Sequence, residues 1–263
     1  IEPFLTGIYA GDTSKMSVKH CLKLFWSLEQ DYGSIILGLF KKKFDKPRSF
    51  NFSNGLGELI ESLSLNFKNK IRLNTSVIDI SKKGDFYKVK TNNNKQYTCK
   101  NVISTVPAFT LSNFIFDKKL GLELNKIQYS PIDVFHFGLK KKNIKNKIDG
   151  FGVLTKKNDK KNFLGILFNS SIFKELAPEG FELFTVLVGG ERNSNLCELD
   201  PKSLEDIILK ELNQLINHSG PVYMSNHYRW KKGIPQYNLD YDLIEDKLKS
   251  FLDQNSNFYI NSN

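Results

Sequence analysis

The chain has 263 residues, of which 40% are hydrophobic and 13% aromatic, enough apolar material for a buried core in one large or two smaller domains. This composition excludes a disordered chain, and with no run of eighteen apolar residues it also excludes a helical membrane span. The net charge of +10 is carried mostly by lysine, whereas arginine, the residue suited to paired base contacts, is scarce, so we expect no nucleic-acid partner.

The first part of the chain is predicted to be mainly helical. Residues 14–40 form helices, with Ser17 as a cap and a second run that starts at Ile35. Asn54-Gly55 opens a further helix with apolar residues at helical spacing. Strands are then expected at 71–80, 86–91, 96–99 and 101–106, the third at a sheet edge and the fourth buried and stopped by Pro107.

Residues 108–128 are predicted as mixed helix and loop, and from Pro131 the chain becomes rich in strands. The expected strands are 134–139, 152–154, 163–168, 182–188, 222–228 and 258–260, with helices at 204–215 and 243–251. Two lysine-rich stretches, 140–147 and 156–161, are expected at hairpin tips with solvated charges. The pattern is that of an α/β (α+β) chain whose sheet segments fall into two groups, which predicts two interleaved subdomains.

The residues that could carry chemistry are few. Three scattered cysteines without a C-x-x-C pair indicate a reducing, cytoplasmic setting, and the four histidines lack the spacing of metal ligands, so no metal site is expected. No signal peptide opens the chain. Gly55-Leu56-Gly57 does not fit the dinucleotide fingerprint and is expected to be a helix-entry turn.

Several phrases, read in order, are more specific. They are Gly7-Ile8-Tyr9-Ala10-Gly11-Asp12, Val102 to Pro107, Gly150 to Leu154, Leu164 to Phe173, Val188-Gly189-Gly190, and Arg229-Trp230 followed by Ile234-Pro235-Gln236-Tyr237. Over essentially the whole chain they resemble the protoporphyrinogen oxidase family, a branch of the flavin-containing amine oxidase superfamily. The phrases at 103–107 and 230–237 are shared across the superfamily, and those at 7–12, 150–154 and 164–173 point to this branch.

The resemblance implies an FAD-dependent amine-oxidase-like fold and an internal piece of a longer enzyme. The family binds FAD through an N-terminal glycine fingerprint that this sequence does not contain, and Ser262-Asn263 resembles the start of its C-terminal flavin motif with Ser in place of Gly. The implied organisation is a helical, membrane-facing remainder of the substrate region over 1–45, part of the FAD-binding domain over 46–107, a β-rich substrate domain over 108–228, and a return to the FAD-binding domain over 229–263.

The resemblance also assigns residues to the cofactor. The backbone at Val77 would touch the adenine end of FAD, and Trp230 would lie near the flavin ring. Gln236 and Asn263 are the further cofactor-binding candidates, and Pro235, Gln236 and Tyr237 would shape the chain beside Trp230. Without the resemblance, Val77 is an ordinary core valine and Trp230 a core tryptophan whose indole N–H finds a carbonyl.

A second set is assigned to a tetrapyrrole substrate. Gly7 is the catalytic and substrate-binding candidate, because a residue without Cβ lets its carbonyl approach the pyrrole N–H groups. Four apolar residues would form the walls of the pocket, although each could equally be plain core: Phe151, Leu154, Leu164 and Leu187.

The implied reaction is the oxidation of protoporphyrinogen IX to protoporphyrin IX. In the family, flavin N5 takes a hydride from a meso carbon, oxygen reoxidises the flavin with release of hydrogen peroxide, and three rounds remove six electrons. Alternatives remain open: the homologous oxidase of coproporphyrinogen III, another flavin amine oxidase (disfavoured by the Gly7 to Asp12 phrase), a basic module that binds anionic lipid or nucleic acid, and a catalytically inert fragment. Expected partners are the tetrapyrrole, the inner face of a bacterial membrane as a peripheral contact, and a homodimer or a companion N-terminal chain.

Overall fold

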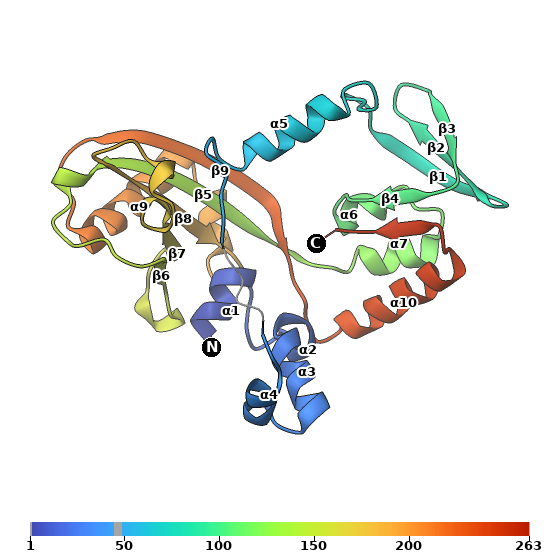
Figure 1. Ribbon diagram of the computed structural model, residues 1–263, viewed down its shortest axis with the longest axis horizontal. Coiled ribbons are helices and arrows are strands. Elements are labelled where there is room, and N and C mark those ends of the chain that lie inside the picture. The colour runs from blue at the N-terminus through green and yellow to red at the C-terminus, as the bar shows by residue number, and fades with distance from the viewer. Residues whose placement is uncertain (1, 45–48, 263) are drawn as a thin grey trace. The chain divides into compact units, whose positions relative to one another are not determined.

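The computed structural model describes residues 2–44 and 49–262, and the chain divides into two compact units, each built from two separate stretches (Figure 1). The first unit comprises residues 1–60 and 129–236, and the second comprises 61–128 and 237–263. The α/β class and its interleaved organisation are confirmed. The unit boundaries differ from those expected after residues 45, 107 and 228, in part because residues 108–128 pack into the core of the second unit.

The first unit is built on a five-stranded antiparallel sheet. Its strand order is β6-β7-β8-β5-β9, so the longest strand, β9, lies at one edge (Figure 1). The bounds are β5 Tyr129–Lys140, β6 Gly152–Leu154, β7 Phe163–Phe168, β8 Phe181–Gly189 and β9 Val222–Pro235.

One face of this sheet is covered by α9 (Pro201–Ile216). The helix contributes a buried residue at every fourth position, which is the spacing of a single helix face. Alternate residues of β5 meet it, since successive side chains of a strand point to opposite faces. Burial of each of these aliphatic side chains stabilises the unit by about 1.5–3 kcal/mol. The fully buried residues of this core include Phe135, Phe137, Leu139, Phe184, Val186, Leu204, Ile208 and Leu212.

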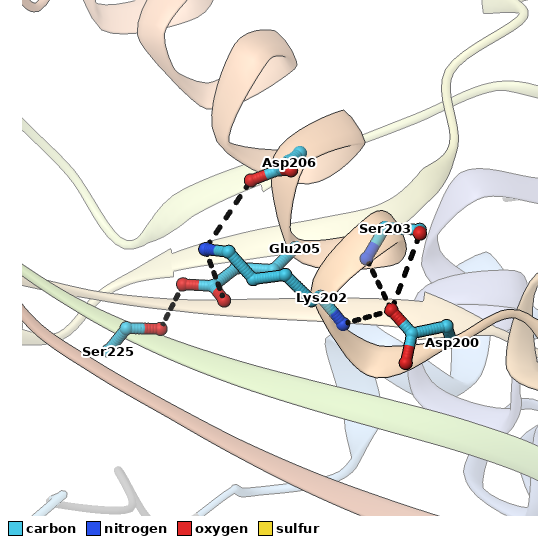
Figure 2. A network of polar contacts seen from close by, with 6 residues as sticks. All are labelled: Asp200, Lys202, Ser203, Glu205, Asp206 and Ser225. Atoms are coloured by element: carbon cyan, nitrogen blue, oxygen red, sulfur yellow. Dashed lines mark hydrogen bonds and ion pairs between the residues drawn. The ribbon is translucent and has the colours of Figure 1, made fainter.

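The start of α9 is held by a polar network (Figure 2). The Asp200 carboxylate accepts the backbone N–H groups of Lys202 and Ser203, each at 3.1 Å, and thereby caps the helix. Glu205 accepts a 2.6 Å hydrogen bond from the hydroxyl of Ser225 on β9. Asp206 lies one residue further on and pairs with Lys202 at 3.5 Å. The network therefore joins the helix start to the edge strand.

The helices of the N-terminal region are α1 (Glu2–Tyr9), α2 (Val18–Cys21), α3 (Lys23–Tyr32), α4 (Ile35–Lys41) and α5 (Gly57–Asn66). Helical structure over 14–40 is confirmed, with breaks that have local causes. Gly33 ends α3 in the left-handed conformation at φ 68°, and the Ser34 hydroxyl caps α4 by accepting from the Leu37 N–H. Ser17 precedes α2 as predicted, but its side chain makes no capping hydrogen bond.

The second unit combines two small sheets with the end of α5 and further helices. The strands β1 (Val77–Lys83), β2 (Phe86–Thr91) and β3 (Gln96–Cys99) form an antiparallel sheet with β3 at its edge, as predicted. A parallel pair is formed by β4 (Val102–Ser104) and β10 (Phe258–Ile260). The helices are α6 (Ala108–Leu111), α7 (Lys118–Leu124) and α10 (Tyr241–Gln254), and the core is aromatic around Tyr87, Phe116, Phe251 and Phe258.

Four local predictions were wrong. The strand expected from residue 71 begins at Val77, after a turn in which Asn74 has a positive φ of 54°. Ile103 of β4, expected to be buried, is 67% exposed. Residues 140–147 join β5 to β6, which are not neighbours in the sheet, so they do not form a hairpin tip, whereas 156–161 do link the paired strands β6 and β7. The strand expected to end at Tyr228 continues to Pro235.

Shorter elements complete the first unit. They are α8 (Asn169–Ile172) and the 3₁₀ turns η1 (Lys141–Asn143), η2 (Lys157–Asp159), η3 (Lys174–Leu176) and η4 (Ser194–Glu198). Across residues 2–44 and 49–262, no helix combines the length and the apolar character needed to cross a bilayer.

Candidate functional site

The face of the five-stranded sheet opposite α9 carries a row of apolar side chains, and we call it the open face. Residues paired directly across antiparallel strands point to the same side of a sheet. The register pairs Leu154 with Gly165, Gly165 with Leu187, Leu187 with Val134, and Val134 with Tyr228. Leu154 is 43% exposed and Tyr228 is 54% exposed. The row therefore crosses the whole sheet. It is exposed at both ends, and Val134 and Leu187 between them are half-buried.

Trp230 lies on the same open face. It is paired with Ile132, two residues along β5 from Val134, and is 59% exposed. Its neighbour Arg229 points to the opposite face, where it meets the buried Asp133. Trp230 is thus not a core residue of the first unit, because its indole ring lies at the surface beside the apolar row.

Helix α1 contacts β6 and β7 and packs over one end of the open face (Figure 1). Ala10, which follows α1, is buried with Ile132 and Leu164, and the half-buried Leu187 packs against this cluster. Leu164 lies at the register shift between Phe163 and Gly165 and is 2% exposed. Two of the predicted wall residues, Leu164 and Leu187, therefore meet beside α1.

Gly7 lies against Leu154. A Cβ atom at Gly7 would come within 2.5 Å of Leu154 Cδ2, closer than carbon atoms approach in proteins. The absence of a side chain at Gly7 thus lets α1 and β6 come together. The structure in this way gathers four sequence-predicted residues around one surface: Gly7, Leu154, Leu164 and Leu187.

Gln236 has an internal position. Its side-chain amide donates to the carbonyls of Tyr9 at 2.8 Å and Ile234 at 3.0 Å, and the residue is 3% exposed. A Cβ at Gly11 would come within 2.0 Å of its carbonyl oxygen. Gln236 therefore connects the end of β9 to the end of α1, and its amide group faces the protein. Pro235 is the last residue of β9 and is also buried.

The other predicted residues are placed elsewhere. Phe151 precedes β6 and is 68% exposed, outside the row. Val77 is the first residue of β1 in the second unit and is half-buried. Tyr237 also belongs to the second unit, where its ring packs on Tyr241 with centroids 4.9 Å apart. Asn263 lies outside the described residues.

Three polar residues of the open face were not predicted. His136, Thr185 and Asn226 form the row next to the apolar one, and His136 Nδ1 lies 2.9 Å from Thr185 Oγ1. Burial lowers the pKa of His136 from its usual 6.5, so the imidazole is neutral at pH 7. The alternation along β5 is visible in the sequence, but the strand register that brings these three together is not.

The surface offers an accessible aromatic ring, apolar side chains and a neutral histidine. This set can bind a flat apolar molecule, and it contains few groups able to transfer protons. The exposed ring of Trp230 fits the resemblance to a flavin-binding surface, since a planar ring system can stack on it. Electron-transfer chemistry at such a site has to come from a bound cofactor.

Comparisons with known proteins identify the family of the chain. Residues 1–260 match the family of flavin containing amine oxidoreductases. The mitochondrial protoporphyrinogen oxidase of Nicotiana tabacum is 27% identical over 94% of this chain and 56% of its own length. The coproporphyrinogen III oxidase of Bacillus subtilis is 25% identical over 91% of this chain and 53% of its own length. The chain thus spans about half the length of the curated relatives it matches.

Solved structures show the same fold. A crystal structure from Exiguobacterium, named as a candidate protoporphyrinogen oxidase, superposes with a TM-score of 0.78 at 22% identity and covers 100% of this chain and 57% of its own. A reduced UDP-galactopyranose mutase gives a TM-score of 0.66 at 17% identity, over 98% of this chain and 56% of its own. The predicted fold is confirmed, and FAD is confirmed as the cofactor at the level of the family. The chain belongs to the flavin-containing amine oxidoreductases.

Proposed function

We propose that the open face binds a porphyrinogen and that the chain serves in the FAD-dependent oxidation of protoporphyrinogen IX to protoporphyrin IX. The observation that carries this proposal is the row from Leu154 through Leu187 and Val134 to Tyr228, with Gly7 at one end. The names of relatives that match more than nine-tenths of the chain support it.

The physical fit is between two apolar surfaces. A tetrapyrrole macrocycle is broad and apolar, and the side chains of Leu154, Leu187 and Val134 present a matching area with Tyr228 and Trp230 beside it. Aromatic residues add stacking to the burial of apolar area. When bound, FAD supplies the electron-accepting chemistry. The role of this chain's residues is to orient the substrate and exclude water.

The terminal acceptor belongs to the same proposal. Conversion of the porphyrinogen to the porphyrin removes six electrons and six protons. With dioxygen as the acceptor, each pair of electrons and protons converts one O₂ to one H₂O₂, so three equivalents of each are exchanged. Hydrogen peroxide released per porphyrin formed is therefore the quantity that tests the acceptor.

A second candidate substrate is coproporphyrinogen III. It is favoured by the match to the Bacillus subtilis coproporphyrinogen III oxidase. The two substrates share the macrocycle and differ in the number of carboxylates, so both would use the apolar row in the same way. A comparison of the two in one assay separates the candidates.

The test begins with binding. We expect protoporphyrin IX to quench the fluorescence of the purified chain, and Leu154→Asp to weaken the binding about tenfold, because a carboxylate placed against an apolar ligand must lose water. Leu122→Asp, on an exposed residue of α7 in the second unit, introduces the same charge at a residue that is not part of the row and should leave the binding unchanged. Equal affinities of the two variants would contradict the proposal.

The catalytic part of the test adds FAD and a separate chain that carries the glycine fingerprint. Porphyrin fluorescence that grows after addition of protoporphyrinogen IX and oxygen, only when both chains and FAD are present, would support the oxidase function. Bound porphyrin without any turnover under these conditions would instead support a binding role.

The second part of the proposed function is a peripheral contact with a membrane, and the exposed apolar residues of α4 support it. Ile36 is 69% exposed and Phe40 is 86% exposed, and Lys41, Lys42 and Lys43 follow directly. Exposed apolar side chains beside lysines suit the surface of an anionic bilayer. We expect Phe40→Asp to reduce co-flotation with vesicles rich in phosphatidylserine, whereas Leu73→Asp, on a leucine of the second unit that is 80% exposed, should not. Equal flotation of the two variants would exclude α4 as the contact.

A further inference from the structure

A cleft of about 500 Å³ opens beside α1, on the side of the helix that carries Thr6. It is lined by the turn at Gly11 and by residues that follow β6 and β8. This volume lies in the range of small-molecule sites. The charged residues of the lining are Glu2, Asp12, Lys15, Lys157, Glu191 and Arg192.

Two of its carboxylates already have partners. Asp12 accepts hydrogen bonds from the backbone N–H of Ser14 at 3.1 Å and from its hydroxyl at 2.7 Å, and lies 3.8 Å from Lys15 Nζ. Glu191 accepts from the hydroxyl of Ser130 at 3.1 Å. Neither carboxylate forms an ion pair with Arg192 or Lys157 within residues 2–44 and 49–262.

Arg192 is a cation with neutral partners. Its Nη2 group donates to Thr155 Oγ1 at 2.7 Å and to the carbonyl of Phe163 at 3.3 Å. Nε and Nη1 are buried and have no hydrogen-bond partner among the described residues. A guanidinium charge held out of water without an anion destabilises the structure unless something compensates it. The exposed ammonium group of Lys157, on the same cleft, is likewise without an ion pair in the described part of the chain.

We propose that this cleft binds a carboxylate, held by the charges of Arg192 and Lys157. A singly charged carboxylate fits better than phosphate, since a second negative charge would be repelled by Glu2, Asp12 and Glu191 on the same lining. The planar carboxylate is also the usual partner of a guanidinium.

The cleft adjoins the open face. Thr6 of the lining precedes Gly7, which packs on Leu154, and Arg192 donates to the carbonyl of Phe163, next to Leu164. A propionate side chain of a tetrapyrrole on the open face is therefore one source of the carboxylate, and a free organic acid is the other. Only the choice of the tetrapyrrole as the source rests on the proposed function.

The first experiment uses sodium propionate as the probe, at constant ionic strength, and follows the backbone amides of Gly11 and Arg192 by ¹H–¹⁵N NMR. We expect saturable shifts, with a dissociation constant raised about two- to fivefold in Lys157→Gln, as for loss of an exposed ion pair. Lys160→Gln removes the same charge three residues away from Lys157 and outside the lining, and should bind as the wild type does. Arg192→Gln should abolish the shifts.

Absence of saturable shifts, or equal dissociation constants for Lys157→Gln and Lys160→Gln, would overturn the proposal. So would tighter binding of inorganic phosphate than of propionate. If Arg192→Gln fails to fold, the Lys157 variant still tests the proposal, since Lys157 is exposed.

A second arm identifies the source by comparing protoporphyrin IX with its dimethyl ester. Tighter binding of the free acid, lost in Lys157→Gln but not in Lys160→Gln, assigns the cleft to a propionate of the tetrapyrrole. Equal binding of the acid and the ester assigns it to a free organic acid and leaves the proposed function intact. If neither form binds, the proposed function fails. The propionate titration then still shows by itself whether the cleft binds a carboxylate.

Discussion

Arg229 and Asp133 face each other across β9 and β5, with Arg229 Nε 2.9 Å from Asp133 Oδ1, and Asp133 is completely buried. His227 Nε2 contacts the same carboxylate oxygen. This cluster lies on the α9 side of the sheet, directly behind the residues that form the open face. The ion pair fixes the register of the edge strand β9 against β5, because apolar contacts alone would allow the strand to slip.

Removal of Arg229 should be strongly destabilising. Arg229→Met removes the guanidinium that pairs with the buried Asp133 carboxylate and leaves His227 as its basic neighbour. We expect a loss of about 3–5 kcal/mol in the free energy of unfolding. Urea denaturation followed by circular dichroism measures it. Lys231→Met, on an exposed residue of the same strand, removes the same charge and should change stability by less than about 0.5 kcal/mol. Equal effects would show that net charge, not the buried pair, is responsible.

The cap of α9 contributes less to the free energy of unfolding than the buried ion pair does. Asp200→Ala removes the acceptor of two backbone N–H groups and should cost about 1 kcal/mol (Figure 2). Asp206→Ala, further along the helix and exposed, loses only a surface pair with Lys202 and should lower the free energy of unfolding by less than about 0.5 kcal/mol. Thermal unfolding of the two variants side by side checks the difference, which disappears if capping does not stabilise the helix.

Gly190 holds the chain after β8 close to Ala10. Its φ is 70°, and a Cβ there would come within 2.5 Å of the backbone carbonyl oxygen of Ala10, which cannot move independently of α1. Gly190→Ala therefore combines backbone strain with a clash. We expect it to lower the free energy of unfolding by about 2 kcal/mol more than a variant that has the backbone strain without the clash. Gly180→Ala, with φ 81° and open space around it, is the matched control for strain. Similar unfolding midpoints for the two variants would contradict the close approach.

The thiol of Cys197 should make stability fall in alkaline solution. Burial, followed by the nearby Asp133 carboxylate, raises the pKa of Cys197 to about 12 from an ordinary value of 9.0. In the unfolded chain the thiol ionises near pH 9, whereas the folded protein keeps it protonated. The contribution of the protonated thiol to the free energy of unfolding is therefore fully present below pH 9 and is lost as the pH rises toward about 12.

Unfolding free energies measured by urea between pH 8 and 11 test this dependence. Cys197→Ala should be less stable than the wild type at pH 8, because it leaves a cavity, and its stability should fall less steeply with pH. Iodoacetamide at pH 8.5 should modify Cys197 only after unfolding, as peptide mass mapping can show. Rapid modification of the native protein would contradict the raised pKa.

Most elements could be predicted from the sequence where apolar residues dominate. Residues 152–154 and 163–168 were placed correctly, and the strand 134–139 was found inside the longer β5. The sequence pattern failed for the second half of β9, since Lys231 and Lys232 at an exposed sheet edge do not alternate with apolar residues. The resemblance named Leu154, Leu164 and Leu187, but their convergence depends on register shifts such as that between Phe163 and Gly165, which no local pattern reveals.

The positions of the polar residues of the site could not be predicted from the sequence either. His136 stands in an apolar strand and was not among the predicted site residues. Its pairing with Thr185 comes from a strand nearly fifty residues away in the sequence. Arg192 follows a glycine pair in a loop, and nothing in its neighbourhood indicates that two of its nitrogens are buried without acceptors. Such properties arise from tertiary packing and become visible only once the fold is known.

The alternation along β5 has a consequence for how this protein can change over generations. Asp133, Phe135 and Phe137 face the packed side, whereas Val134 and His136 face the open side of the same strand. Substitutions at the first set are constrained by folding, and substitutions at the second alter what the surface can hold while leaving the packed side intact. Neighbouring positions of one strand therefore meet separate requirements: folding at residues 133, 135 and 137, and surface chemistry at residues 134 and 136.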